Sequence, residues 1–312
     1  MTRGVFSGLV VVGMLFFTGC SDKSSNKMIS GRVIDHYIQG ASVYTPSGVK
    51  ANKPTDEWGA FTIEETGEPL IAEGGKDIAT KEEFIGKLKA PAGSKIINSL
   101  TNEVQAAIEE KGKSLGDAKK YIKSKFDLPN IDITSYDPIE GLVNNPNSQD
   151  AKDTLARQAQ VQAVLNATAK ALKEHANADP KKAFEEASVI ILETINSPKD
   201  VEKPETIEKI LESTAKEVGV KKEVMNTLAS KADDFAVKMV EVIKVIEEAK
   251  DENAEKLVKT VEAAVKVAEK VAEEPEKVQD VEVEVNTIEK NITVTLPPKD
   301  IYEEGPTTGA EG

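Results

Sequence analysis

Hydrophobic positions along the chain follow two different periods, and the change between them divides the sequence into two parts. From Ile29 onward, apolar and polar residues alternate in short runs such as 29–34 and 60–63, with turn residues at 46–48 between them. Such alternation is typical of half-buried strands bounded by turns. The first part therefore predicts a small β module over residues 29–95.

Beyond this module the spacing of apolar residues changes to three and four, which is the period of a helix. Leu100 begins one such stripe, and Gly112 ends it. Ser114 precedes a second stripe, and with Asp117 three residues later it forms the pattern of a capping box. The sequence thus predicts two short helices and a connector over residues 96–147.

The segment 148–274 keeps the helical period almost throughout. We predict five helices here, because prolines begin two of them and a glycine follows one. The fourth covers residues 221–250, and at 1.5 Å per residue it would be about 45 Å long. Such a length fits an elongated antiparallel bundle, or long helices that project as a stalk. The predicted helices cover residues 149–176, 180–196, 205–219, 221–250 and 253–273.

Alternation returns near the C-terminus, where Val281, Val283 and Val285 are separated by acidic residues. We therefore predict a β-hairpin over residues 278–297 that packs on the β module, and a disordered tail over residues 298–312. The resulting fold class is α+β. It combines a small antiparallel β-sandwich-like module, which the hairpin could complete, with a larger, elongated antiparallel helical bundle.

The composition excludes several classes of function. The chain has 54 acidic and 40 basic residues, and its net charge of −14 repels nucleic acid and anionic lipid headgroups. Only 4% of the residues are aromatic, so small aliphatic side chains must fill the core. The single cysteine, Cys20, excludes a disulfide within one chain.

The first twenty residues have the pattern of a lipoprotein signal peptide. Arg3 precedes an uncharged stretch over residues 5–17, which is shorter than the ~20 apolar residues that a membrane-spanning helix needs. The stretch Phe17-Thr18-Gly19-Cys20 follows, and it resembles the lipobox of bacterial lipoproteins, with phenylalanine in place of the usual leucine.

This resemblance implies how and where the protein is held. It implies a signal peptide over residues 1–20, acyl chains on Cys20, and a flexible tether over residues 21–28. Ser21 after the cysteine is similar to the sorting signal of outer-membrane lipoproteins. The predicted location is therefore the bacterial cell envelope, with a lipid anchor in the outer membrane.

The β module resembles a known family as well. Gly31-Arg32-Val33, then Ile38-Gln39-Gly40-Ala41, then Gly59-Ala60-Phe61 follow one another as a strand opening, a crossover and a later strand. In this order they resemble the prealbumin-like, carboxypeptidase-regulatory-like β modules of bacterial surface lipoproteins, with His36 in place of a crossover glycine. The resemblance implies an envelope lipoprotein with such a module at its N-terminus and a helical C-terminal region.

Few residues are candidates for chemistry. The two histidines are His36 and His175. His36 lies beside Asp35 in a predicted turn. His175 lies near the C-terminal end of a predicted helix, where its positive form interacts favourably with the helix dipole. His36 could act as a ligand or a general base, but a place in a turn explains it as well. Adjacent acids such as Asp233 and Asp234 do not face each other on a helix. We therefore assign no catalytic, cofactor-binding or metal-binding residue.

Together these features predict a non-enzymatic scaffold in the cell envelope. Its partners would be the membrane, through acyl chains on Cys20, and another protein or a surface polymer that binds the helical region. One alternative is an accessory or catalytic subunit of extracellular or cell-wall glycan processing, which converging carboxylates in a deep pocket would favour. Another is a self-assembling surface component, which exposed strand edges or an apolar tip would favour.

Overall fold

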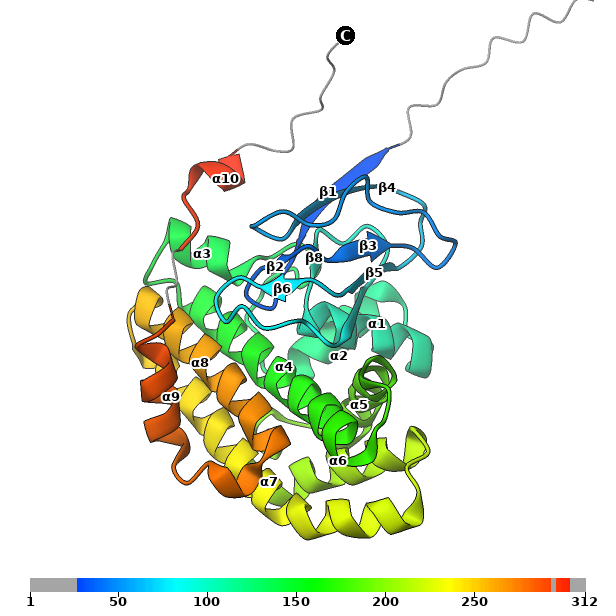
Figure 1. Ribbon diagram of the computed structural model, residues 1–312. Helices are drawn as coiled ribbons and strands as arrows, with labels where there is room; N and C mark the ends of the chain where they lie inside the picture. Colours follow the sequence, from blue (N-terminus) through cyan, green and yellow to red (C-terminus); the bar gives the residue numbers. More distant parts are fainter. Residues whose placement is uncertain (1–26, 293–295, 304–312) are drawn as a thin grey trace, which may run out of the picture.

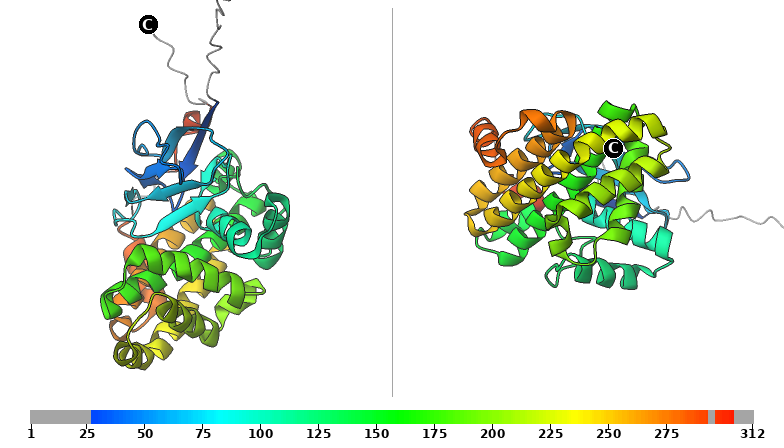
Figure 2. Two further views of the ribbon diagram at one scale, coloured as in Figure 1. Left: turned by 90° about the vertical axis from the view of Figure 1, so that its right-hand side faces the viewer. Right: turned by 90° about the horizontal axis from the view of Figure 1, so that it is seen from below.

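The computed structural model describes residues 27–292 and 296–303, where a layer of short strands lies on a larger assembly of helices (Figure 1). The predicted α+β class is confirmed. The left-hand view of Figure 2 shows that the strands gather at one end of the molecule. The strands are β1 (Met28–Val33), β2 (Ile38–Gln39), β3 (Ser42–Tyr44), β4 (Ala60–Glu64), β5 (Leu70–Glu73), β6 (Lys76–Asp77), β7 (Lys87–Ala90) and β8 (Ile96–Ile97).

The described strands form three small sheets, with the orders β4-β1-β8, β2-β6 and β3-β5-β7. In the first sheet β1 is antiparallel to β4 and parallel to β8. The alternation seen in the sequence sets the register, because Ile29 pairs with Ile63 and both side chains are buried. The sheet extends past residue 95, since β8 follows that limit.

Gly31 allows β1 to pass close to the chain before β8. A Cβ atom at this position would lie 2.1 Å from the Lys95 carbonyl oxygen. The same oxygen accepts a hydrogen bond from the Arg32 N–H at 2.8 Å. The contact between these two segments therefore requires a residue without a side chain.

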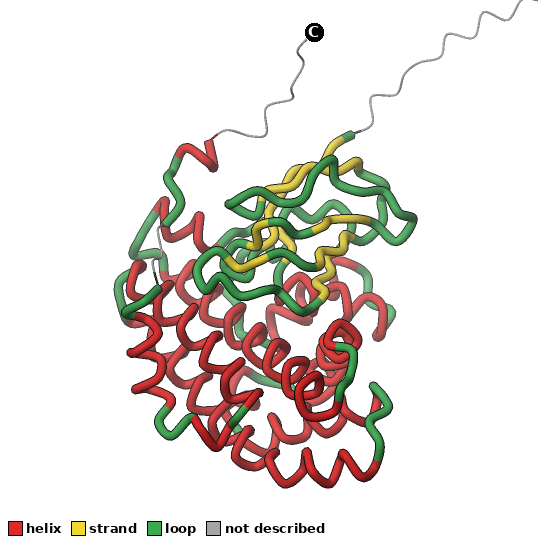
Figure 3. The backbone as a smooth tube through the Cα atoms, viewed as in Figure 1, coloured by secondary structure: helices red, strands yellow, loops and turns green. Residues whose placement is uncertain are grey.

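Helices make up the larger part of the described chain (Figure 3). Most helix boundaries lie close to their predicted positions. Gly112 adopts the left-handed conformation (φ 60°) after α1, and the Ser114 hydroxyl accepts the Asp117 N–H at 3.2 Å at the start of α2. The α-helices are α1 (Ser99–Lys111), α2 (Leu115–Lys125), α3 (Pro138–Asn144), α4 (Gln149–Ala176), α5 (Pro180–Thr194), α6 (Pro204–Glu217), α7 (Lys222–Glu248), α8 (Ala254–Glu273), α9 (Val281–Glu289) and α10 (Asp300–Glu303). Short 3₁₀ turns occupy Pro198–Glu202, Ala249–Asp251 and Pro275–Lys277.

Helix α4 lies at the centre of the molecule, between the strands and the other long helices (Figure 1). Eighteen of its 28 residues are buried, so it is covered on all sides. Gln158 connects it to the start of α1, where it accepts hydrogen bonds of 2.8 Å from the Asn98 amide and the Ser99 hydroxyl. Helices α7 and α8 pack on α4 and on each other, so the stalk arrangement is wrong.

The hairpin predicted over residues 278–297 is wrong. Its first arm forms α9, where the Asp280 carboxylate accepts the Val283 N–H at 3.0 Å. Val281 and Val285, four residues apart, are buried on the face toward α7 and α8, whereas Val283 is 60% exposed. The three valines fit a helix as well as a strand, and packing on α8 decides between them. Residues 293–295 of the second arm lie outside the described residues.

The predicted tether and the predicted tail each contain residues that form regular structure. Strand β1 begins at Met28, inside the predicted tether, and residues 21–26 lie outside the described residues. In the predicted tail, Asp300–Glu303 forms α10. The Tyr302 hydroxyl lies 2.5 Å from that of Tyr37, so the start of the tail is bound to the β layer. Residues 304–312 lie outside the described residues.

Candidate functional site

The residues singled out in the sequence do not form a site together. Cys20 lies outside the described residues, and its acylation stays a prediction. His36 is 2% exposed, and neither of its ring nitrogens has a hydrogen-bond partner among the described residues. Burial lowers the pKa of His36, which keeps its imidazole neutral. The His175 Nε2 lies 3.0 Å from the Ala272 carbonyl oxygen and so links α4 to α8.

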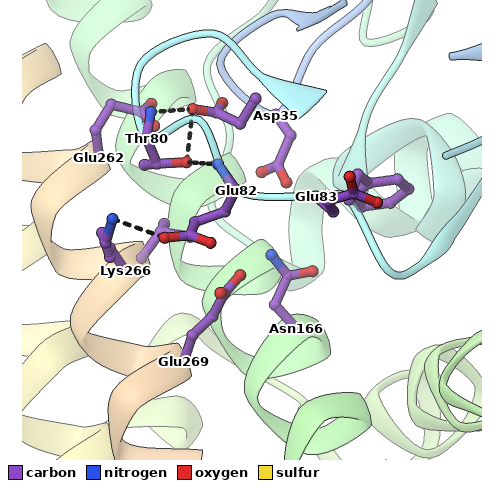
Figure 4. A pocket seen from close by; sticks show the side chains of 11 residues that line it. Asp35, Thr80, Glu82, Glu83, Asn166, Glu262, Lys266 and Glu269 are labelled. Carbon is purple, nitrogen blue, oxygen red and sulfur yellow. Dashed lines mark hydrogen bonds and ion pairs between the residues drawn. The ribbon is translucent and has the colours of Figure 1, made fainter. Parts of the chain in front are cut away.

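Six carboxylates to which the sequence gave no role line a small cavity between the strands and the helices (Figure 4). Glu82 and Glu83 lie in the loop after β6. Asp35 belongs to the turn after β1, and Asp77 ends β6. Glu262 and Glu269 lie on one face of α8, because residues seven apart on a helix share a face. Asn166 of α4 also lines the cavity, whose volume is about 20 Å³.

Asp77 is satisfied by hydrogen bonds. Its Oδ1 accepts the N–H of Ala79 at 2.9 Å, the N–H of Thr80 at 2.6 Å and the Thr80 hydroxyl at 2.9 Å. Its Oδ2 accepts the His36 N–H at 3.4 Å. Asp77 therefore fixes the loop after β6 against the turn after β1, which brings Asp35 to the cavity.

Glu262 is buried on α8, with a side chain that is 2% exposed. Burial raises the pKa of Glu262 well above its usual range, and the negative charges of Asp77 and Asp35 raise this pKa further.

The pKa values of Asp35 and Glu269 are shifted in the same direction as that of Glu262. Burial raises the pKa of Asp35 well above its usual range, and Asp77 and Glu269 add to the shift, while the Asn166 side chain opposes it. Burial also raises the pKa of Glu269 to about 7, against the lowering effect of Lys170. Asp35, Glu262 and Glu269 are thus more easily protonated than usual.

Lys266 pairs with only one of the carboxylates that line the cavity. Lys266 of α8 also lines the cavity, but its Nζ forms an ion pair of 2.7 Å with Glu82 (Figure 4). Buried carboxylates without a basic partner take up protons or bind a cation. A volume of about 20 Å³ admits roughly one water molecule or one ion, and it is too small for a sugar ring. The cavity as placed therefore does not admit a glycan.

A larger groove lies where α1, α5 and β7 meet. Its volume is about 410 Å³, which is in the range of sites for small ligands. Lys89 forms ion pairs there with Glu109 at 3.0 Å and Glu185 at 3.3 Å, and Glu110 and Glu186 add two further negative charges. With four glutamates and one lysine, the groove is suited to basic groups.

As placed in the described chain, no three histidine, cysteine or acidic side chains form a group that could hold a metal ion. No described helix is both long and apolar enough to cross a membrane. No family model matches the chain, and no curated protein or solved structure is similar to it. The predicted order of the two regions, a small β region and then a larger helical region, is confirmed.

One of the missed residues carried a signal in the sequence. Glu262 interrupts the apolar run Val261-Glu262-Ala263-Ala264-Val265, so a charged residue stands among core positions of α8. A charged residue among core positions of a helix is buried by its place in the pattern. Such a residue is unusual, because carboxylates are almost never fully buried without a partner. Asp35 and Asp77 lie in turns, where acidic residues are common, and nothing local distinguishes them.

Proposed function

We propose that this chain is a lipid-anchored protein of the bacterial cell envelope, attached through acyl chains on Cys20 to the outer membrane. There it acts as a non-enzymatic scaffold whose helical region binds another protein or a surface polymer. The proposal extends the lipobox resemblance, and one structural observation supports its orientation.

That observation is the place where β1 begins. Met28 opens β1 at the end of the molecule opposite α6 and the start of α7 (Figures 1 and 2). Met28 follows Cys20 by eight residues, which can span at most about 29 Å even when fully extended. The strand layer would therefore lie near the membrane and the helices would face away from it.

The charge of the chain supports attachment by lipid rather than by its surface. A net charge of −14 is not attracted to anionic headgroups. Acyl chains contribute about 0.8 kcal/mol for each buried methylene, and two or more chains hold a protein stably. Membrane association should thus depend on Cys20 and resist high salt.

The acidic groove beside α1 and α5 is the binding surface that we assign to the partner. Its size and its four glutamates fit a protein segment or a polymer that carries amino or guanidinium groups. The groove lies on the helical side of β7, so a partner could reach it while the strand layer stays near the membrane.

Attachment is tested by membrane fractionation of three forms in the native host. The wild type and a Ser21→Ala control should stay in the membrane pellet after a high-salt wash and should incorporate radioactive palmitate. Cys20→Ala should be soluble and unlabelled. A Cys20→Ala protein that pellets like the control would contradict the anchor.

Partner binding is tested by crosslinking in the native envelope and affinity capture. We expect one reproducible partner for the wild type, and its loss when Glu109 and Glu186 are both replaced by lysine. Glu252→Lys, an exposed change outside the groove, serves as the charge control. Equal capture by the groove variant and the control would reject the groove as the binding surface.

A further inference from the structure

Residues 296–303, which include α10, lie beside the strand layer and are called the strap below (Figure 1). The side chains of residues 298–300 in the middle of the strap are exposed. Its buried and half-buried side chains are those of Leu296, Pro297, Ile301 and Tyr302. The strap therefore meets the rest of the protein through two short stretches, one on each side of an exposed middle.

Arg32 of β1 binds the second stretch of the strap. One guanidinium nitrogen donates to the Ile301 carbonyl oxygen at 2.8 Å, and the guanidinium carbon lies 5.0 Å from the centre of the Tyr302 ring. These are a charge-assisted hydrogen bond and a cation–π contact. The other terminal nitrogen of Arg32 donates to the Trp58 carbonyl oxygen at 3.0 Å. The bond to Trp58 fixes the guanidinium within the strand layer, so its position does not depend on the strap.

Tyr37 binds the hydroxyl group at the end of the Tyr302 side chain. The two hydroxyl oxygens lie 2.5 Å apart, and the Tyr37 hydroxyl also donates to Asp137 at 2.8 Å. A tyrosine hydroxyl has one proton, and that of Tyr37 is directed at Asp137. Tyr302 is therefore the donor toward Tyr37. The surface selects a side chain that combines an aromatic ring with a hydrogen-bond donor at its tip.

The strap is attached to the strand layer by side chains rather than by strand pairing. In the described chain it joins none of the three sheets. Its backbone bonds are local, from the Ile301 N–H to the Pro298 carbonyl at 3.2 Å and from the Tyr302 N–H to the Lys299 carbonyl at 3.1 Å. Release of the strap therefore breaks no strand pair and leaves the described sheets intact.

We propose that Arg32, Tyr37 and Trp58 form a binding surface for a tyrosine-bearing peptide segment, and that the strap occupies this surface as a reversible intramolecular ligand. The surface recognises a backbone carbonyl, a tyrosine ring and a tyrosine hydroxyl. A partner protein that presents the same groups competes with the strap and releases the C-terminal segment. The inference is independent of membrane attachment and of the acidic groove.

Covalent attachment gives the strap an advantage over a free peptide. A ligand linked to its own site has an effective concentration on the order of 1 mM. If the free segment has a dissociation constant of about 100 µM, the strap fills the surface in roughly ten of eleven molecules. A free peptide then binds the wild type roughly 10-fold more weakly than it binds a chain whose strap is released.

The test uses the full chain in mild detergent and a fluorescein-labelled peptide with the sequence of residues 296–303. Fluorescence polarisation should show saturable binding to Tyr302→Ala, whose strap lacks its anchor, and roughly 10-fold weaker binding to the wild type. Lys299→Ala, an exposed change in the same segment, should bind the peptide like the wild type. A peptide with alanine in place of its tyrosine should bind Tyr302→Ala at least ~10-fold more weakly than the original peptide.

Two measurements locate the bound peptide. Combining Arg32→Ala with Tyr302→Ala should weaken peptide binding at least ~10-fold, because it removes the carbonyl and ring contacts together. Trp58 is the only tryptophan of the chain, and its ring centre lies 6.2 Å from that of Tyr37. Its fluorescence emission should therefore shift when the peptide binds to Tyr302→Ala. This second readout decides the location if the double variant does not fold.

Three outcomes would overturn the proposal. The first is the absence of saturable peptide binding to Tyr302→Ala, or binding that is equal for both peptides. The second is a Tyr302→Ala chain that does not fold, since the strap would then be a fixed part of the core. The third is a wild-type dimer that Tyr302→Ala converts into a monomer in analytical ultracentrifugation, since the strap would then bind a second copy of the chain.

Discussion

The Tyr37 hydroxyl donates a hydrogen bond of 2.8 Å to the Asp137 carboxylate, and this bond joins the turn after β1 to the first turn of α3. The other oxygen of Asp137 accepts the N–H groups of Ile139 at 2.8 Å and Glu140 at 3.1 Å. Asp137 is 4% exposed. One buried carboxylate therefore caps a helix and binds the strand layer at the same time.

Tyr37→Phe should lower the free energy of unfolding by about 1–3 kcal/mol, because it removes a hydrogen bond to a buried charged group. Urea denaturation measures the change. Tyr302→Phe is the matched control, since it removes a hydroxyl that touches Tyr37 but leaves the bond to Asp137 in place. Its loss should be below about 1 kcal/mol. Equal losses for the two variants would show that the bond to Asp137 contributes little.

Gly31→Ala should destabilise the protein by about 3 kcal/mol or more, because the added Cβ would overlap the Lys95 carbonyl oxygen and push β1 away from β8. Gly116 provides the opposite case. It lies in α2, and a Cβ there meets no atom within 4 Å. Gly116→Ala should therefore stabilise the protein by about 0.5–1 kcal/mol. Thermal unfolding of both variants tests the pair, and a neutral Gly31→Ala would refute the close approach.

Local chemistry explains which parts of the fold the sequence predicts. The range 149–176 coincides with α4 because Ser148 caps its start and Asn177 ends it in the left-handed conformation. These boundaries depend on neighbouring residues and are visible in the sequence. The short strands were predictable for the same reason, since alternation between Ile29 and Val33 sets one buried face.

Contacts between distant segments explain the errors. The segment Val281–Glu289 has a pattern that fits two structures, and its packing on α8 selects the helix. The carboxylate cavity joins Asp35 to Glu262, which belong to opposite halves of the sequence. No local pattern encodes their meeting, because the turn after β1 reaches α8 only when the strand layer sits on the helices.

Lys125→Met should lower the free energy of unfolding by about 1–3 kcal/mol. The Lys125 ammonium is 4% exposed and donates hydrogen bonds to the carbonyl oxygens of Leu192, at 3.0 Å, and Ile195. These carbonyls lie at the C-terminal end of α5, where helical partners are missing. Methionine keeps the volume but leaves the Ile195 carbonyl without this donor, while the Leu192 carbonyl keeps the Tyr121 hydroxyl at 3.3 Å. Lys120→Met on the exposed side of α2 should change stability by less than about 0.5 kcal/mol, and chemical denaturation compares the two.

A second buried carboxylate gives the protein a pH-dependent stability. Glu103 of α1 is fully buried, and the Ser188 hydroxyl of α5 donates to its Oε1 at 2.6 Å. Its Oε2 has no hydrogen-bond partner among the described residues. Burial raises the pKa of Glu103 to about 8, although the Ser188 and Asn102 side chains lower it. Glu103 is therefore mostly protonated at pH 7.

Glu103→Gln should remove part of this pH dependence. Because the folded pKa of about 8 exceeds the unfolded value of 4.5, the stabilising contribution of the protonated group is complete below pH 4.5 and is lost as the pH rises to 8. At about 1.4 kcal/mol per pKa unit, the wild type should lose about 3 kcal/mol relative to Glu103→Gln between pH 5 and pH 8. Urea denaturation at several pH values measures this difference. Glu110→Gln, exposed on the same helix, should follow the wild type, and a Glu103→Gln curve parallel to both would place the Glu103 pKa near its ordinary value.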